Sequence, residues 1–163
     1  MSGGEREAGM KKQIYAEFER CMNCQACEVA CQRENGGLSL IKVILIADLF
    51  AVPLTCRQCD PAPCAMACPT QALSISGDEV TLDAKKCTGC ALCRFACPFG
   101  MMNYNPESKL AAHCDLCAKR RTDGQDPVCI LTCPSRALRY EDHVSYTLRE
   151  RRRASTEILR AQP

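Results

Sequence analysis

The sequence has no tryptophan, only four phenylalanines and only two histidines among its 163 residues. A chain with so few large apolar side chains builds a thin core, and thin cores usually need crosslinks or bound metal. The sequence also lacks a G-x-G-x-x-G fingerprint, a P-loop and any nucleophile with a base beside it. No motif therefore predicts a nucleotide-dependent enzyme or a hydrolase, and we expect no catalytic residues.

Long apolar runs are also missing. The longest, residues 38–50, is interrupted by Lys42 and Asp48 and is too short to span a bilayer. The opening residues, MSGGEREAGMKKQ, lack the apolar stretch of a secretory signal, which favours a cytoplasmic protein with no membrane span. The basic run RERRR at 149–153 has no aromatic residues beside it, so no nucleic-acid partner is expected.

Cysteine, in contrast, is abundant, with 16 residues. Disulfides belong to oxidising compartments, so metal ligation is the favoured use of these thiols. The first and third groups of four have the spacing C-x2-C-x2-C-x3-C, whereas the second and fourth groups insert residues before their third cysteine. No cysteine is left over from the four groups, which are Cys21, Cys24, Cys27 and Cys31; Cys56, Cys59, Cys64 and Cys68; Cys87, Cys90, Cys93 and Cys97; and Cys114, Cys117, Cys129 and Cys133.

This spacing is the bacterial ferredoxin run for a [4Fe–4S] cluster, in which the fourth cysteine binds the other cluster of a pair. Pro69, Pro98 and Pro134 follow the last cysteine in three groups, and proline ends a helical turn. Zinc is the alternative, because C-x2-C pairs also form zinc sites, but His113 and His143 are not at ligand spacing. We expect four [4Fe–4S] clusters, with His113 solvated or beside a ligand.

The segment between the second and third groups predicts how the groups pair. It alternates apolar residues on both sides of a Gly-Asp turn at 77–78, which predicts a β-hairpin. A hairpin between two such runs is the plan of a two-cluster ferredoxin, although pairing of consecutive groups is an alternative. Exchange of fourth ligands then gives cluster a (Cys21, Cys24, Cys27 and Cys133), cluster b (Cys114, Cys117, Cys129 and Cys31), cluster c (Cys56, Cys59, Cys64 and Cys97) and cluster d (Cys87, Cys90, Cys93 and Cys68).

The predicted fold is α+β, with two nested bacterial-ferredoxin-like modules and little regular secondary structure. The stretches KQIYAEFER and PSRALRYED should form short strands at the two ends of the outer module. The expected organisation is a flexible N-terminus (1–12), an outer module (13–55 and 99–141), an inner module (56–98) and a helical tail (142–163).

Several further side chains are expected to serve the clusters. We expect apolar residues to pack around them: Ala26, Val29, Ala30, Leu92, Phe95, Ala96, Met101, Met102, Leu116 and Ile130. Phe95, Tyr104 and Tyr140 are interpreted as packing residues and not as electron relays. Basic residues could offset cluster charge: Lys85, Lys86, Arg94, Lys119, Arg120 and Arg121. The loop 118–128 is expected to be a docking or tuning element beside an end cluster.

The tail is expected to contact a neighbouring subunit. Its apolar residues Leu148, Ile158 and Leu159 give a poor stripe for folding back as an ordinary core helix. A helix that buries little against its own chain often packs against another, and the arginines at 149–153 would suit an acidic partner surface.

The phrases CMNCQACEVACQREN, VPLTCRQCDPAPCAMACPTQAL, CTGCALCRFACPFGMMNYNP and HCDLC resemble the four-cluster ferredoxin-like electron-transfer subunits of multi-subunit oxidoreductases. The resemblance implies electron relay between a large catalytic subunit and a second redox subunit, flavin-containing or similar. The small iron–sulfur subunit of a tungsten aldehyde oxidoreductase is the nearest in size. Alternatives are formate dehydrogenase, hydrogenase or carbon monoxide dehydrogenase partners, a freely diffusing polyferredoxin, or copies stacked into conducting filaments.

Overall fold

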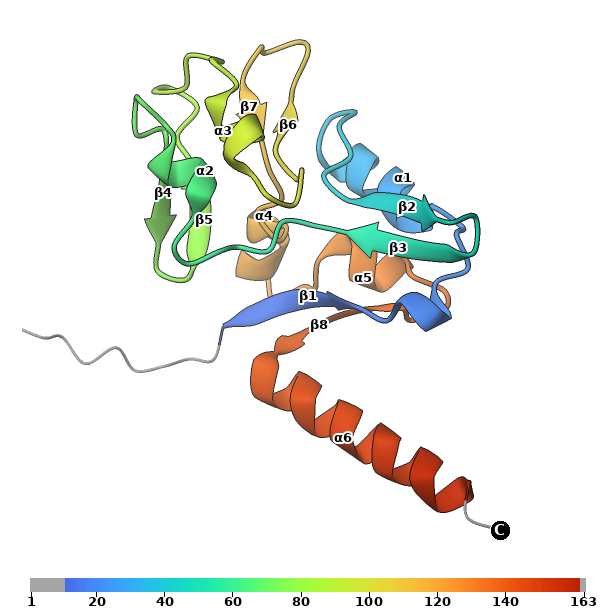
Figure 1. Ribbon diagram of the computed structural model, residues 1–163. Helices are drawn as coiled ribbons and strands as arrows, with labels where there is room; N and C mark the ends of the chain where they lie inside the picture. The colour runs from blue at the N-terminus through green and yellow to red at the C-terminus, as the bar shows by residue number, and fades with distance from the viewer. Residues whose placement is uncertain (1–10, 162–163) are drawn as a thin grey trace, which may run out of the picture.

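Short helices and two-stranded sheets joined by long loops make up the computed structural model, which describes residues 11–161 (Figure 1). Within these residues the strands form four antiparallel pairs. This arrangement confirms the α+β class with little regular secondary structure. Most of the N-terminal segment expected to be flexible lies outside the described residues, and Lys12 already belongs to the first strand.

The two ends of the described chain meet in one sheet. Strand β1 (Lys12–Ala16) pairs with β8 (Leu138–Asp142), and Ile14 lies opposite Tyr140 in the register. Both flanking segments were predicted to be strands, and both predictions are confirmed. The chain thus leaves from one strand of this sheet and returns to the other after all the cysteines.

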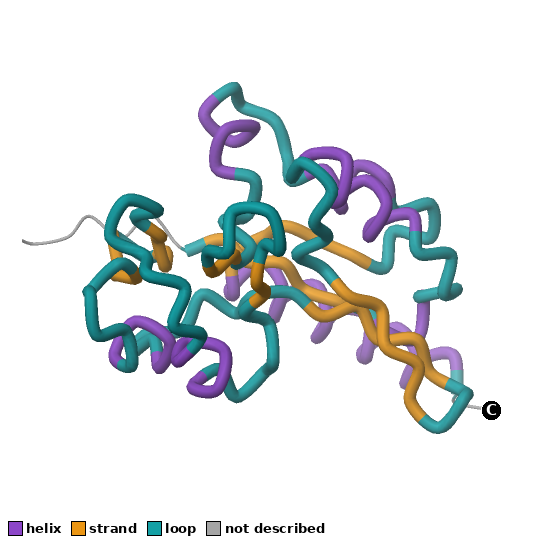
Figure 2. The backbone as a smooth tube through the Cα atoms, turned by 90° about the horizontal axis from the view of Figure 1, so that it is seen from above, coloured by secondary structure: helices purple, strands orange, loops and turns teal. Residues whose placement is uncertain are grey.

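The remaining strands form hairpins, and Figure 2 shows them among surrounding loops and short helices. The hairpin predicted between the second and third cysteine groups is confirmed, with its turn at Gly77. The longest apolar run of the sequence contributes to another hairpin, and no helix within residues 11–161 is both long and apolar enough to cross a membrane. The hairpins are β2 (Lys42–Ile46) with β3 (Phe50–Leu54), β4 (Leu73–Ser76) with β5 (Glu79–Leu82), and β6 (Asn103–Tyr104) with β7 (Ala111–Ala112).

Proline sets where the cysteine-bearing helices end. Cys97 and Cys133 follow α3 and α5 with ψ values of 111° and 106°, because a residue before proline avoids the helical region. No proline follows Cys31, and its helix continues to Glu34. The short helices are η1 (Phe18–Arg20), α1 (Ala26–Glu34), α2 (Pro63–Met66), α3 (Leu92–Ala96), α4 (Ala118–Thr122) and α5 (Val128–Thr132).

Two small apolar cores lie around the cysteine helices. Helix α1 packs with α5, and α2 packs with α3 (Figure 1). The first core contains Ile14, Cys27, Cys31, Leu40, Ile41, Cys114, Leu116, Cys129 and Leu138. The second contains Ala62, Cys64, Leu73, Val80, Cys93, Met102 and Ala111. The second core therefore also draws on residues beyond 98, where the sequence placed the end of the inner module.

The tail forms helix α6 (His143–Arg160), as the sequence predicted. It begins at Asp142, whose carboxylate accepts a hydrogen bond of 2.9 Å from the Ser145 N–H. No residue of the helix is buried, and Figure 1 shows it running away from the two cores. The expectation that it is not an ordinary core helix is therefore confirmed.

Candidate iron–sulfur sites

All four cysteine groups share one backbone feature. The residue before the second cysteine has a left-handed conformation in every group: φ is 56° at Asn23, 48° at Gln58, 70° at Gly89 and 56° at Leu116. Alternation of right- and left-handed residues forms concave nests of backbone N–H groups, which occur at many iron–sulfur sites. The four groups are therefore repeats in backbone geometry as well as in cysteine spacing.

In the third group this conformation requires glycine. A Cβ atom at Gly89 would lie 2.3 Å from the carbonyl oxygen of Lys109, which is far inside contact distance. The φ of 70° also disfavours most other residues. The other three groups carry Asn, Gln or Leu at the same place, so the restriction in this group comes from the approach of the Lys109 backbone.

The fourth cysteine of each group accepts hydrogen bonds at sulfur. The Met101 N–H donates to Cys97 Sγ at 3.4 Å, and the Ala137 N–H donates to Cys133 Sγ at 3.2 Å. Each donor stands four residues after its cysteine, beyond a proline and a left-handed residue. The Cys-Pro turn therefore presents a donor to the sulfur, and donors of this kind stabilise anionic thiolate.

Cys31 has no following proline and obtains its donors differently. Asn35 Nδ2 donates to its sulfur at 3.3 Å, and the Leu40 N–H donates at 3.2 Å. Asn35 lies one helical turn further along, just beyond the end of α1. The longer helix and the loop after it replace the Cys-Pro turn of the other groups.

Hydrogen bonds at Cys68 favour the thiolate form. Desolvation raises its pKa, but hydrogen bonds from the Leu73 N–H and the Thr70 hydroxyl hold the pKa below its ordinary value. Cys68 lines one pocket with three cysteines of the following group, Cys87, Cys90 and Cys93. The four thiols assigned by sequence to cluster d are therefore together.

Neighbouring thiols also group in the other sites. Burial raises the pKa of Cys27 to about 11, and the nearby Cys133 and Cys21 contribute to the increase. Burial likewise raises the pKa of Cys56, as do its neighbours Cys59 and Cys97. In both cases the close thiols include the fourth cysteine of another group.

Two thiols of the fourth group, Cys114 and Cys129, are more deeply buried. Burial raises the pKa of Cys114 to about 12, with further contributions from Cys31, Cys56 and Cys117. The pKa of Cys129 is raised by burial and then by neighbours that include Cys31 and Cys114. Such thiols ionise in a dry protein only when a bound cation compensates the charge, as in a metal centre.

Single-metal chemistry fits this arrangement poorly. Zinc binds thiolates at about 2.3 Å, so the ligands of one zinc ion lie close together. Within residues 11–161, no three His, Cys, Asp or Glu side chains are spaced to hold one metal ion. Thiols gathered from two cysteine groups, with N–H donors on sulfur, fit a polynuclear cluster. Such clusters, when bound, supply reversible one-electron chemistry.

The structure corrects several expectations about the surroundings of the thiols. Leu116, Met101 and Met102 are buried, as expected for packing residues. The packing prediction is wrong for Phe95, whose exposed fraction is 85%, and for two further exposed residues, Val29 and Leu92. Sequence spacing placed these residues on helices near the ligands, but their side chains point to solvent.

His113 is buried, so the expectation of a solvated histidine is wrong. Its Nε2 lies 2.7 Å from the Val80 carbonyl oxygen in the β4–β5 hairpin. The histidine precedes the ligand candidate Cys114, which fits the second expectation, a residue beside a ligand. It thus connects the fourth cysteine group to the inner hairpin.

Two arginines tie part of the loop 118–128 to the rest of the chain. Arg121 forms two hydrogen bonds of 2.6 Å with the carboxylate of Glu79 in β5. Arg120 pairs with Glu34 at 3.5 Å. These arginines therefore bind the chain's own carboxylates, and their role towards a partner or a cluster stays a prediction.

Two important polar residues were missed by sequence reasoning. Gln58 is buried between the second and fourth groups, and Glu17 is buried under the tail helix. Gln58 occupies one of the two unspecified positions of a C-x2-C motif and Glu17 lies in no motif, and the contacts that define both residues join segments far apart in the sequence. A lone Gln or Glu carries no signal of burial.

Sixteen cysteines in four repeated groups, with N–H donors on sulfur, define an iron–sulfur protein of the electron-transfer class. The 4Fe-4S dicluster domain matches residues 47–143, more than half of the chain. The chain is 33% identical to an iron–sulfur protein of Rhodospirillum rubrum, with 91% of each chain covered. It belongs to this family of 4Fe-4S dicluster proteins.

Two further relatives are named for electron transfer or oxidoreduction. The thiosulfate reductase electron transfer subunit PhsB of Salmonella typhi is 37% identical, over 75% of this chain and 71% of PhsB. The putative oxidoreductase UacF of Escherichia coli (strain K12) is 41% identical over 82% of this chain. The match spans 22% of the length of UacF, so most of that protein has no counterpart here.

Proposed function

We propose that this chain carries four [4Fe–4S] clusters and relays electrons for a multi-subunit oxidoreductase without catalytic residues of its own. The observation that carries this proposal is the pocket formed by Cys68 with Cys87, Cys90 and Cys93, because it brings the fourth cysteine of one group to three cysteines of the next. Exchange of fourth ligands is how two-cluster ferredoxins are built. We extend the assignment to all four sets, with clusters a, b, c and d as defined above.

The four sites are proposed to form one line in the order a, b, c, d. Packing of α1 with α5 supports the neighbourhood of a and b, and packing of α2 with α3 supports that of c and d. Cys56 is among the thiols whose charge raises the pKa of Cys114, which supports contact between b and c. The exposed Cys24 and Cys90 belong to a and d, so these clusters would exchange electrons with partners.

The proposed partners are a large catalytic subunit and a second redox subunit, flavin-containing or similar. Relatives named as subunits of thiosulfate reductase and of formate hydrogenlyase support a multi-subunit setting. A tungsten aldehyde oxidoreductase partner is our preferred case, from size alone. A cytoplasmic location is proposed because free thiols persist in reducing compartments.

Helix α6 offers a surface for such a partner. Tyr146 stacks on Tyr15 with ring centroids 4.1 Å apart, so this face is turned towards the chain's own β1. Val144, Leu148 and Leu159 are exposed and spaced by about whole turns on another face. This small apolar face is turned to solvent, in keeping with the expectation that the helix does not fold back on its own core. We propose that it docks a neighbouring subunit, either the catalytic chain or another copy.

The crossed assignment is tested with Cys31→Ser in anaerobically prepared protein. Wild type should contain 16 iron and 16 sulfide per chain, one atom of each for each of the 16 cysteines. The variant should lose or alter the cluster bound by Cys114, Cys117 and Cys129, as followed by EPR and iron content. Selective damage at Cys21, Cys24 and Cys27 would reject crossing, and stoichiometric zinc with little iron would reject the clusters altogether.

A further inference from the structure

One buried glutamine connects the two apolar cores. Gln58 has 1% of its surface exposed, and it is the one polar member of the largest fully buried side chains in residues 11–161. It stands between Cys56 and Cys59, in the left-handed position of the second cysteine group. A buried amide of this kind is costly unless its polar atoms are paired.

Its side chain is paired across the junction. Gln58 Nε2 donates to the carbonyl oxygen of Cys114 at 2.5 Å. Gln58 Oε1 accepts from the Val80 N–H at 2.7 Å. One amide therefore holds the backbone of a cluster b ligand and the hairpin of the second core at the same time.

Two neighbouring hydrogen bonds restrain Gln58 and its partner Val80. Val80, whose N–H donates to Gln58, also contacts His113: its carbonyl oxygen lies 2.7 Å from His113 Nε2. His113 directly precedes Cys114 in the sequence. Lys11 Nζ donates to the Gln58 carbonyl oxygen at 2.5 Å. Burial and hydrogen bonding on each side leave Gln58 little freedom, so the Cys56–Cys59 loop and Cys114 are fixed relative to each other.

We propose that Gln58 is a positioning residue for electron transfer between clusters b and c, because its amide sets the separation of their ligand loops. This inference rests on the proposed function. In the step that it serves, one electron leaves one site and arrives at the other, with no bond broken and no proton moved. Gln58 itself is neither a ligand nor a redox group.

The test uses Gln58→Met in the anaerobically purified holoprotein. Methionine has similar length but can make neither hydrogen bond. We expect unchanged iron and sulfide content, a weaker magnetic interaction between neighbouring reduced clusters in EPR, and electron redistribution after flash photoreduction slowed by about tenfold or more, since small misplacements strongly affect rates. Hydrogen exchange should also become faster at the Val80 amide, which loses its acceptor.

Glu79→Gln is the matched control. It removes the charge of the ion pair with Arg121 across the same junction but leaves both hydrogen bonds of the Gln58 amide in place, so it should keep the wild-type EPR interaction and rate. A Gln58→Met variant with full clusters and wild-type interaction and rate would overturn the proposal. If the Gln58→Met variant loses iron, the Gln58→Glu variant tests the proposal instead. This second variant keeps the acceptor for the Val80 N–H and loses the donor to the Cys114 carbonyl oxygen.

The Gln58→Glu variant should hold its clusters and show the slow redistribution. Loss of clusters from it as well would assign Gln58 a purely structural role and overturn the proposal. Absence of [4Fe–4S] clusters from the wild type would instead reject the proposed function, which separates the two failures.

Discussion

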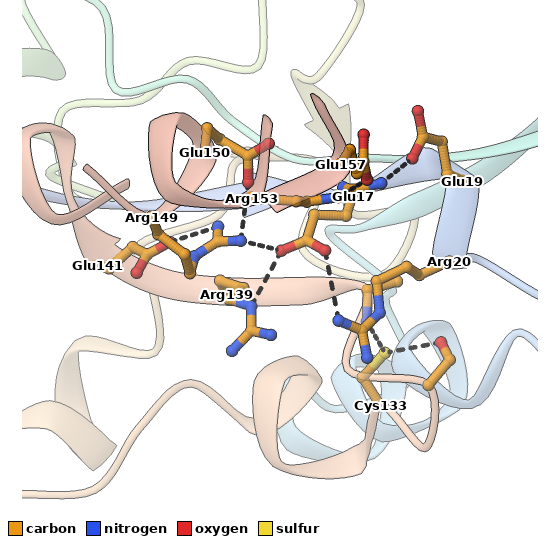
Figure 3. Close-up of polar contacts among 12 residues, drawn as sticks. Glu17, Glu19, Arg20, Cys133, Arg139, Glu141, Arg149, Glu150, Arg153 and Glu157 are labelled. Carbon is orange, nitrogen blue, oxygen red and sulfur yellow. Dashed lines mark hydrogen bonds and ion pairs between the residues drawn. The ribbon is translucent and has the colours of Figure 1, made fainter. Parts of the chain in front are cut away.

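A buried carboxylate is one of the groups that attach α6, and its removal has a calculable effect. The Glu17 side chain is 5% exposed, accepts hydrogen bonds from Arg139 at 3.0 Å and Arg149 at 2.5 Å, and pairs with Arg20 at 3.6 Å (Figure 3). Replacing one partner of a fully buried ion pair costs about 3–5 kcal/mol. Exposed pairs contribute about 0–1 kcal/mol.

Glu17→Gln should fall between these limits, because Arg149, the partner of Glu17 in α6, is 27% exposed and keeps contact with water. We expect a loss of about 2 kcal/mol in the free energy of undocking α6, a value between the buried and exposed cases. At about 1.4 kcal/mol per factor of ten, the undocked population rises about 30-fold.

Hydrogen exchange of the α6 amides measures this population. An isolated helix of this length is marginal in water, so undocking exposes its amides to exchange. Glu157→Gln is the control, since Glu157 pairs with Arg153 at the exposed surface and should have no measurable effect. An exchange rate for Glu17→Gln within about threefold of wild type, or about 0.7 kcal/mol, would refute the reasoning.

The pH dependence follows from the same contacts. Desolvation raises the pKa of Glu17, but the Arg139 hydrogen bond and the charges of Arg149 and Arg20 lower it more, so the folded pKa lies below the ordinary value. The depressed pKa means that the stabilisation is complete above the unfolded pKa of about 4.3 and is lost as pH falls through the folded value. The ratio of variant to wild-type exchange should therefore approach one in acid.

Two other surfaces give testable expectations. Arg121→Gln removes the paired hydrogen bonds to Glu79, so exchange at the β4–β5 hairpin should accelerate while iron content stays at the wild-type level; an unchanged hairpin would show that Arg121 does not hold the modules together. Leu148→Ser on the outer face of α6, or truncation after Glu141, should preserve all clusters and weaken assembly with the catalytic subunit in size-exclusion chromatography, whereas assembly at wild-type strength would remove α6 from the interface.

Local spacing made much of the fold predictable. The β4–β5 hairpin, the ends of α3 and α5 at Cys-Pro, and the strands at both chain ends follow from patterns within a few residues of one another. The burial of His113 and Gln58 could not be predicted in this way, because their partners stand 33 and 56 residues away. Phe95 was misplaced for a related reason: a short helix fixes the spacing of its residues but not the face that its neighbours cover.

The cysteine groups also differ where their repeat is broken. Cys31 is followed by Gln32 in place of proline, so α1 continues and two donors, Asn35 and Leu40, reach its sulfur. Hydrogen bonds to sulfur stabilise the more negative, reduced state of a cluster and raise its potential. Both donors lie at proposed cluster b, across the Gln58 junction from proposed cluster c. The absence of a proline after Cys31 thus changes the helix length and the source of the sulfur hydrogen bonds, and under the proposed assignment we expect this change to affect the potential of cluster b.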